Sequence, residues 1–317
     1  MSFPASPLPG FPRTGPGEVL LVCAHFGHGS PVWGGLLDRI GGHRAGGVLD
    51  LEGSGVRLRM VEDARWDRLR GGSAPALVPG GPVRPVLVLA DAPASYEWGA
   101  PLVVDLAGMP GRGVRVAPER LGGVLAGVLG GWLGFGELVR GMDRCGRYPG
   151  EGDRPACSAG VVAVRSGFPL LPSTGSALLV RTCFADEPGW HALLEDLGGT
   201  DGEGWIGTDR DPGDIDTDHY PLEALVVDDL AYRDLVPGQV PALVAPSARP
   251  SLVALATART FSEPGRPLTA VDLDSAPGRC AVLPSRLVGS MACNLEMSNM
   301  DFHDFVVAEG VTPWWEP

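Results

Sequence analysis

The sequence predicts an α/β protein made of two tandem homologous domains, each a mixed sheet of three parallel strands plus a hairpin, with flanking helices. Three observations lead to this prediction. Two long stretches of the chain align with each other in the same order. Each contains short runs rich in Val and Leu between helical segments, which is typical of buried parallel strands. Each also contains a proline- and glycine-bearing turn between two further strands, which indicates a hairpin.

The duplication is clearest at the start of each copy. Residues 17–42 align with residues 175–199 through an apolar strand, then Phe26 with Phe184 and Trp33 with Trp190. Three further segments match in order: 59–69 with 225–235, 85–92 with 250–258, and 103–112 with 270–279. A repeat of this length indicates two copies of one domain.

The second copy shows the elements in their simplest form. A first strand precedes the helix that carries Trp190, a second strand precedes a short helix, and a third strand follows. Two more strands are joined by the turn Asp-Ser-Ala-Pro-Gly, and a long helix closes the copy. The five expected strands lie at residues 177–182, 223–228, 251–257, 268–273 and 279–283.

The domain boundaries follow from the repeat and from local composition. We expect a disordered Pro/Gly-rich tail at 1–16, a first repeat at 17–168 with an irregular segment at 142–159, a linker at 169–174, and an acidic second repeat at 175–317. The amino-terminal residues lack the apolar core of a signal peptide. Long uncharged apolar runs are also missing from the sequence, so we expect a cytoplasmic protein without a membrane span.

Composition excludes several kinds of chemistry. All 25 basic residues are arginine, which excludes a Schiff-base lysine and a Walker-type phosphate site. The six cysteines form no C-x-x-C pair, so we expect no structural zinc and no other metal or cofactor. The nucleophile-elbow, dinucleotide and zinc-protease motifs are absent as well. The sequence therefore identifies no catalytic residue and leaves open whether the protein is an enzyme.

Charge is unevenly distributed between the two halves. Residues 1–170 carry 17 Arg against 15 acidic residues, whereas residues 171–317 carry 8 Arg against 23. A net charge of −13 argues against nucleic acid or an anionic membrane and favours a cationic protein or peptide as partner. The expected docking residues lie in one acidic loop: Asp209, Asp211, Asp214, Asp216 and Asp218.

That loop also resembles part of a calcium-binding loop, because Asp214, Asp216 and Asp218 alternate with other residues. The resemblance fails at two positions. His219 stands where the sharp turn of such a loop needs glycine, and Val226 stands where it needs a bidentate glutamate. A solvated acidic loop is the better interpretation.

The stretch ACNLEMSNMDFHDF, residues 292–305, is unusually polar and permits two interpretations. In the first, it begins a helix: Ser298 and Asp301 form a capping box, and Met297 packs on Phe302 as a hydrophobic staple.

In the second interpretation, the same stretch is a ligand site. Asn294, Asn299, Asp301 and His303 would then form a polar cluster near the carboxyl ends of the strands, where open α/β sheets bind ligands. The first copy has lost both asparagines and the Asp301 counterpart while keeping Phe135. A cap needed for folding is expected in both copies, so this loss adds some weight to the ligand site, but the helix start remains the preferred interpretation.

Asp228 and Asp229 follow the second strand and are matched by Glu62 and Asp63 in the first copy. Paired carboxylates there could bind a divalent ion or act as acid and base. They could equally cap the short helix that follows. Both copies keep the pair, which favours the cap.

The second copy resembles an uncharacterised bacterial domain family whose members open with an ALLVRT pattern and close with Asn-Leu-x-x-x-Asn-Met-Asp-Phe. The first copy resembles it only through its core and is degenerate. The family has no known activity, so the resemblance implies a fold and no chemistry. The residues that carry it are Ala177 to Thr182, Phe184, Asp186, Trp190, Leu193, Asn294, Leu295, Asn299, Met300, Asp301 and Phe302.

Two functions remain open at this point. The first is a non-catalytic tandem binding or regulatory protein, comparable to immunity proteins, whose acidic second repeat docks a cationic partner. The alternative is an enzyme or small-ligand sensor with a polar pocket at Asn294, Asn299, Asp301 and His303.

Overall fold

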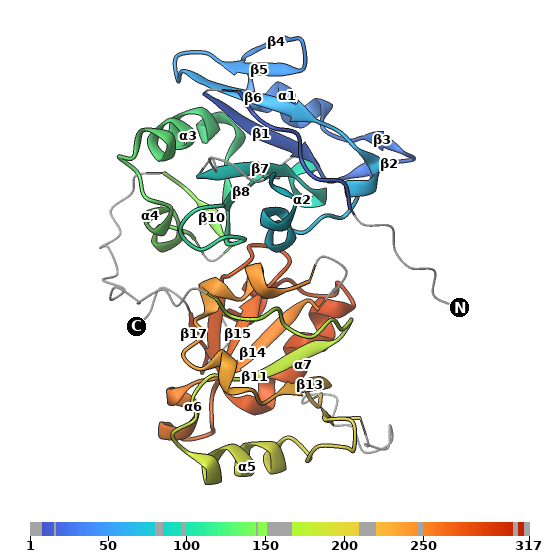
Figure 1. The fold of residues 1–317 in the computed structure, drawn as a ribbon, viewed down its shortest axis with the longest axis vertical. Helices are drawn as coiled ribbons and strands as arrows, with labels where there is room; N and C mark the ends of the chain where they lie inside the picture. The colour runs from blue at the N-terminus through green and yellow to red at the C-terminus, as the bar shows by residue number, and fades with distance from the viewer. Residues whose placement is uncertain are drawn as a thin grey trace. The chain divides into compact units, whose positions relative to one another are not determined.

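The computed structural model describes residues 8–15, 17–79, 85–96, 99–143, 145–150, 167–208, 220–245, 250–306 and 310–313. The chain divides into two compact units, Met1–Ala156 and Cys157–Pro317 (Figure 1). Each unit contains one large sheet with helices beside it, which confirms the prediction of a mixed α/β fold in two tandem regions. Within the described residues, no helix is both long and apolar enough to span a membrane.

The sheet of the first unit has eight strands in the order β10-β9-β8-β7-β1-β6-β5-β4. Its central strand β1 pairs in parallel with both β6 and β7, and β8 and β9 follow in antiparallel order. The strands are β1 (Glu18–Cys23), β4 (His43–Ala45), β5 (Val48–Leu51), β6 (Val56–Val61), β7 (Val86–Ala90), β8 (Leu102–Asp105), β9 (Gly113–Val116) and β10 (Arg147–Tyr148), beside a separate small hairpin of β2 (Phe26–Gly27) and β3 (Ser30–Pro31).

The sheet of the second unit has seven strands in the order β12-β13-β11-β14-β15-β16-β17. Here β11 is the central strand, parallel to β13 and β14, and β15 and β16 are antiparallel to their neighbours. The strands are β11 (Ala177–Arg181), β12 (Trp205–Ile206), β13 (Ala224–Val227), β14 (Leu252–Ala256), β15 (Leu268–Asp272), β16 (Cys280–Leu283) and β17 (Thr312–Pro313).

Both sheets are therefore larger than the five strands expected from the sequence. The first gains the hairpin β4–β5 and the edge strand β10, and the second gains the edge strands β12 and β17. β10 lies within 142–159, which was expected to be irregular. Most of these additions are only two or three residues long, too short to show an apolar periodicity.

Helices cover the sheets in corresponding places. Trp33 lies directly before the first helix of its unit and Trp190 lies within the first helix of the other, and both side chains are buried. The α-helices are α1 (Gly34–Ile40), α2 (Ala92–Ser95), α3 (Leu121–Gly130), α4 (Phe135–Arg140), α5 (Glu187–Asp196), α6 (Ala258–Ser262), α7 (Ser285–Glu296) and α8 (Phe302–Val306). The 3₁₀ helices are Ala64–Trp66, Gly71–Leu77, Pro118–Arg120, Leu230–Tyr232, Pro237–Gln239 and Pro241–Leu243.

The chain before β1 is not simply the disordered tail expected for residues 1–16. Phe11 is buried, and its ring meets that of Trp66 edge to face with the centroids 5.0 Å apart. The N–H of Phe11 donates to the carbonyl of Leu77 at 2.7 Å, and Trp66 Nε1 donates to the carbonyl of Pro9 at 2.9 Å. Residues 8–15 thus contribute to the core, because one aromatic side chain outweighs their Pro/Gly composition.

The expected linker at 169–174 has the same role in the second unit. Leu171 is buried, and its N–H donates to the carbonyl of Leu243 at 2.8 Å. Tyr232 Oη donates to the carbonyl of Leu170 at 2.8 Å. The two segments make equivalent contacts, so the residues that precede β1 and β11 pack against the cores of their units.

A buried ion pair fixes the hairpin between β15 and β16. The carboxylate of Asp272 accepts the N–H groups of the three turn residues 274–276 at 2.8 to 3.0 Å and binds Arg279 Nη2 at 2.6 Å. The two side chains are only 2% and 0% exposed. Arg279 also stacks on the ring of Phe302, 4.8 Å from its centroid, and so connects the turn to α8.

The first repeat has an equivalent ion pair, between Asp105 and Arg112, but the hydrogen bonds of the arginine differ. Asp105 accepts the N–H groups of residues 107–109 and binds Arg112 Nη2 at 3.2 Å, and Arg112 stacks on Phe135. Burial lowers the pKa of Arg112 below its usual value, although Asp105 opposes the shift. Among the described residues, Arg112 Nε has no hydrogen-bond partner, whereas Arg279 Nε donates to Asp272.

Replacing Arg279 with Leu should destabilise the second repeat by about 3–5 kcal/mol, because the Asp272 carboxylate would remain buried without its cation. Hydrogen exchange of the amides in β15 and β16, with the full chain, measures the loss. The matched control is Arg266→Leu, which removes an exposed pair with Asp196 and should cost about 0–1 kcal/mol. Equal losses in the two variants would contradict the assignment.

Candidate functional site

The polar stretch 292–305 spans the end of α7 and the start of α8, so the predicted helix start at Ser298 is wrong. α7 continues to Glu296, and Ser298 follows it with φ +53°, in the left-handed region. In the first repeat Gly131, at the corresponding place after α3, has φ +74°. A left-handed residue after a helix is a common way to end it, so Ser298 terminates α7 and does not begin α8.

The start of α8 is capped by Asp304, not by Ser298. The N–H of Asp301 donates to Asp304 Oδ2 at 2.9 Å, and in the first repeat the N–H of Gly134 donates to Glu137 Oε2 at 2.6 Å. Both repeats therefore keep a helix cap, and the argument that the first copy had lost it is wrong. The predicted staple is also wrong, because the Met297 side chain is 60% exposed.

The two asparagines of the motif stabilise the end of α7. Asn294 Nδ2 donates to the carbonyl of Ser290 at 2.8 Å, and Asn299 Nδ2 donates to Asn294 Oδ1 at 2.8 Å. The N–H of Asn299 donates to the carbonyl of Asn294 at 3.0 Å. These bonds satisfy polar groups that a helix leaves unpaired at its carboxyl end.

The motif lies at the amino ends of the parallel strands, opposite to the expected position. Burial and the nearby Glu223 raise the pKa of Glu296, the last residue of α7, while a hydrogen bond from the N–H of Ala177 opposes the shift. Ala177 is the first residue of β11. Because α7 follows a strand that runs in the direction of β11, it returns to the amino ends of the strands.

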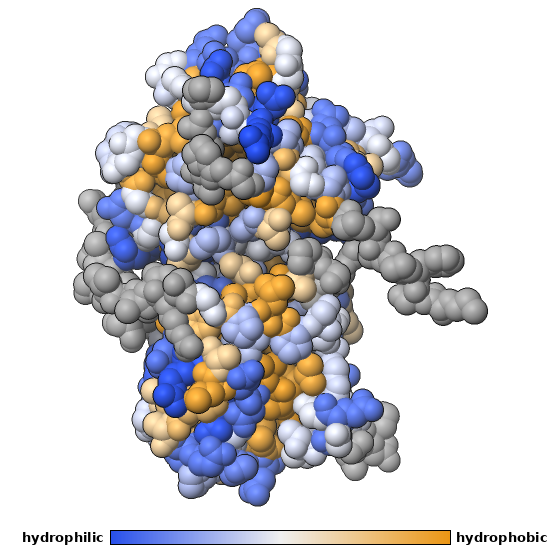
Figure 2. Space-filling view, in the orientation of Figure 1, coloured by the Kyte–Doolittle hydropathy of each residue, from blue (hydrophilic) through white to orange (hydrophobic). Residues whose placement is uncertain are grey.

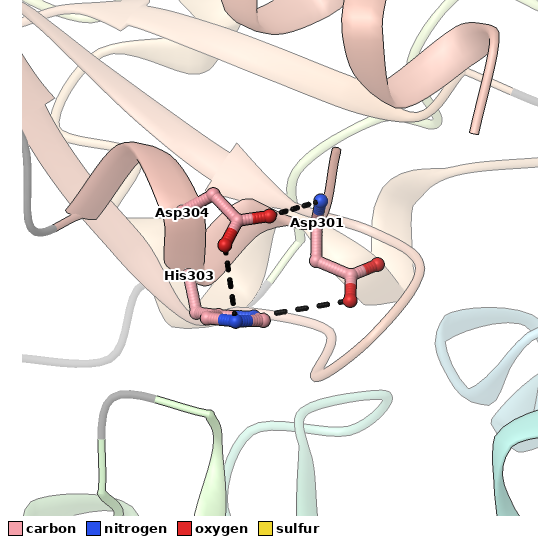
Figure 3. Close-up of side chains that lie close together, drawn as sticks. All are labelled: Asp301, His303 and Asp304. Carbon is pink, nitrogen blue, oxygen red and sulfur yellow. Dashed lines mark hydrogen bonds and ion pairs between the residues drawn. The ribbon is translucent and has the colours of Figure 1, made fainter. Parts of the chain in front are cut away.

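Asp301, His303 and Asp304 form a small cluster on the surface (Figure 3). His303 Nε2 lies 3.2 Å from Asp304 Oδ1, and His303 Nδ1 lies 3.9 Å from Asp301 Oδ2. One ligand atom from each residue lies within 4.8 Å of the others, a spacing that could hold a metal ion. The first repeat has glycine at the two positions equivalent to Asp301 and His303, so these two side chains are what the second repeat adds to the cap.

The two acidic residues that follow β13, Asp228 and Asp229, have different roles. Asp229 caps the helix Leu230–Tyr232 by accepting the N–H of Ala231 at 2.8 Å, as Asp63 does in the first repeat. Asp228 instead accepts Trp190 Nε1 at 2.9 Å. Both lie beyond the carboxyl end of β13, so the structure does not bring them together with the Asn294 cluster at the other end of the sheet.

Arg181, which sequence reasoning missed as a site residue, organises that carboxyl end. It is the last residue of β11, and its side chain is 2% exposed. Its guanidinium binds Glu187 at 2.7 Å and Asp228 at 3.3 Å, and lies 4.6 Å from the ring centroid of Phe184. Cys23 occupies the equivalent position in the first repeat. An arginine in an otherwise apolar strand, aligned with a cysteine in the other copy, was the sequence feature that could have identified Arg181.

The electrostatics around Arg181 favour a positioning role. Burial opposes its charged form, but Glu187 and Asp228 together raise the pKa of Arg181 above its usual value. In return, the hydrogen bond from Arg181 holds the pKa of the Glu187 carboxyl below its usual value. With carboxylates on two sides and aromatic rings beside it, the guanidinium fixes the connection from β11 to α5.

The acidic loop can be described only at its edges. Asp201 forms a turn by accepting the N–H groups of Glu203 at 2.9 Å and Trp205 at 2.8 Å. The expected docking residues lie outside the described residues: Asp209, Asp211, Asp214, Asp216 and Asp218.

Comparison with known proteins identifies a family but no characterised relative. A family model described as "Domain of unknown function (DUF6924)" matches residues 18–151 and again residues 176–312. No curated protein and no solved structure matches the chain. The first repeat is matched over nearly the same length as the second, although its polar residues differ.

Replacing Asp304 with Ala should cost about 1 kcal/mol, because the N–H of Asp301 would lose its cap. Glu137→Ala should cost a similar amount in the first repeat, whereas Asp301→Ala should cost less, since its side chain makes no cap bond. Amide hydrogen exchange in α8 and α4 measures these effects. A larger loss from Asp301→Ala than from Asp304→Ala would contradict the cap assignment.

Proposed function

The chain belongs to the DUF6924 family, with one copy of the domain in each repeat, and we propose that it is a non-catalytic binding or regulatory protein. In this proposal the acidic second repeat docks a cationic protein or peptide, in the manner of immunity proteins. The partner contains arginine or lysine, because the surface that it meets carries an excess of carboxylates.

The carboxylate excess is the observation that supports this proposal. Between residues 171 and 317, the described residues include 16 carboxylates and 6 arginines. Four of these arginines bind carboxylates of their own unit: Arg181, Arg259, Arg266 and Arg279. The described part of the unit therefore has ten more carboxylates than arginines, and a cationic partner would relieve the repulsion among these carboxylates.

The exposed rim at the carboxyl ends of the strands is the part of this surface that suits a protein partner. Asp228, Asp229 and Asp234 are exposed there, and Leu230 among them is 54% exposed. An apolar side chain surrounded by charges suits an interface in which an apolar contact is flanked by ion pairs. On the visible face of the second unit, hydrophilic and hydrophobic patches likewise lie side by side (Figure 2).

We expect a short arginine-rich peptide to bind the full chain, with an affinity that falls as salt concentration rises. Isothermal titration calorimetry measures this binding. The rim variant Leu230→Ala with Asp234→Asn and the loop variant Asp214→Asn with Asp216→Asn should each bind the peptide more weakly. Asparagine tolerates the left-handed backbone of Asp234, φ +63°, so the rim variant keeps its fold.

The control variant removes the same number of charges as the loop variant, but from the first repeat: Asp50→Asn with Glu62→Gln. Both side chains are exposed. If the control weakened peptide binding as much as the loop and rim variants do, the affinity would depend only on the net charge of the chain. That result would refute docking through the second repeat.

The alternative function, a small-ligand sensor or enzyme, is favoured by the added residues Asp301 and His303 beside the shared cap. It predicts that a divalent ion such as Zn²⁺ binds the full chain and that His303→Ala abolishes the binding. Calorimetry with Zn²⁺ measures this, and His191→Ala, on an exposed histidine paired with Glu187, is the control. Binding that is unchanged in His303→Ala would exclude this site.

A further inference from the structure

The first repeat contains a cavity of about 540 Å³ beside α3 that is open to solvent. Its volume lies within the range of roughly 300–1,000 Å³ that is typical of small-molecule sites. It is lined by the end of α1, the turn after β5, the 3₁₀ helix Pro118–Arg120, α3 and the side chain that follows α3. The residues on which the argument depends are Glu52, Ser54, Glu119, Gly123, Ala126 and Trp132.

Trp132 forms an aromatic wall of this cavity. Its side chain is 68% exposed, yet the indole lies against α3. A Cβ atom at Gly127 would lie 2.9 Å from Trp132 Cη2, and one at Gly130 would lie 2.9 Å from Trp132 Cδ1. These two glycines therefore make room for the ring against the helix, which leaves a large aromatic surface open to solvent.

The charged groups that line the cavity are both negative. Glu52 and Glu119 stand at its edge, and among the described residues neither of them forms an ion pair. Ser54 is already bonded, because its Oγ donates to the carbonyl of Leu51 at 2.7 Å. The remaining lining is apolar or glycine, so the cavity combines two carboxylates with an aromatic face.

The second repeat differs at the corresponding helix. Arg286 stands where the first repeat has Glu119, and Asn299 stands where it has Trp132. A Cβ atom at Gly289 would overlap the backbone of Tyr220, whose N–H donates to Ser290 Oγ at 3.1 Å. In the first repeat the equivalent glycine is Gly122, where a Cβ atom would lie 3.4 Å from Ser54 Oγ, in ordinary contact. At Gly123, the next residue of α3, a Cβ atom would meet no described heavy atom within 4 Å outside the helix backbone.

We propose that this cavity binds a small organic cation of the alkylammonium or guanidinium class. The cationic group faces Glu52 and Glu119, and its apolar surface lies on the indole of Trp132, the strongest aromatic partner for a cation. An inorganic cation such as Na⁺ would use the carboxylates but must lose tightly held water before it can contact the ring, so it gains less from Trp132. The site lies in the first repeat and is independent of docking through the second.

Calorimetry with the full chain and with tetramethylammonium or guanidinium chloride tests the proposal, with sodium chloride at equal concentration as reference. The native chain should bind an organic cation, and Trp132→Ala should weaken that binding by about tenfold. Glu119→Gln should weaken it as well. Gly123→Leu should abolish binding by filling the cavity, while its greater helix propensity maintains α3.

The control is Glu195→Gln, which removes one exposed carboxylate from α5 in the other repeat and should leave binding unchanged. The proposal fails if the native chain binds neither organic cation, or if Glu195→Gln weakens binding as much as Glu119→Gln. It also fails if Trp132→Ala and Gly123→Leu bind like the native chain. If an arginine-containing peptide bound much more tightly than free guanidinium, and Trp132→Ala weakened that peptide binding, the cavity would belong to a protein partner and the small-molecule proposal would be overturned.

Discussion

The buried pair of Asp272 and Arg279 connects more of the repeat than any other single interaction described above. The carboxylate of Asp272 accepts hydrogen bonds from the N–H groups of the turn, and the guanidinium of Arg279 stacks on Phe302 of α8. A buried ion pair is tolerated only when its remaining hydrogen-bonding groups are also satisfied. The turn must therefore adopt one conformation, and this fixes the register of β15 against β16 and the position of the closing helix.

The first repeat keeps this construction while its surface chemistry changes. Asp105, Arg112 and Phe135 repeat the contacts of the second copy, and the helix caps at Glu137 and Asp304 are equivalent. These groups are fixed because each has a partner in the fold. Side chains without such partners were free to diverge, which is why the two repeats carry different candidate surfaces.

That divergence changes how the polar motif of the second repeat is understood. Asn294, Asn299 and Asp304 are used to end one helix and begin the next, so most of the motif has a structural role. Only Asp301 and His303 lie outside that role. Most of the acidic character of the second repeat lies outside the motif, because only three of the 16 described carboxylates belong to it: Glu296, Asp301 and Asp304.

The sequence by itself determined the duplication, the α/β class and the central strands, because apolar runs and matched positions are local signals. It also indicated that Asp229 is a cap, since both copies keep an acidic residue there. It could not locate the end of α7, because a left-handed serine leaves no distinctive pattern. It could not find the contribution of Phe11 and Leu171 to the cores, because Pro/Gly-rich composition concealed it. Only the tertiary structure joined Arg181 to Glu187 and Asp228, because these residues lie on separate elements and meet only when β11 and β13 pair side by side.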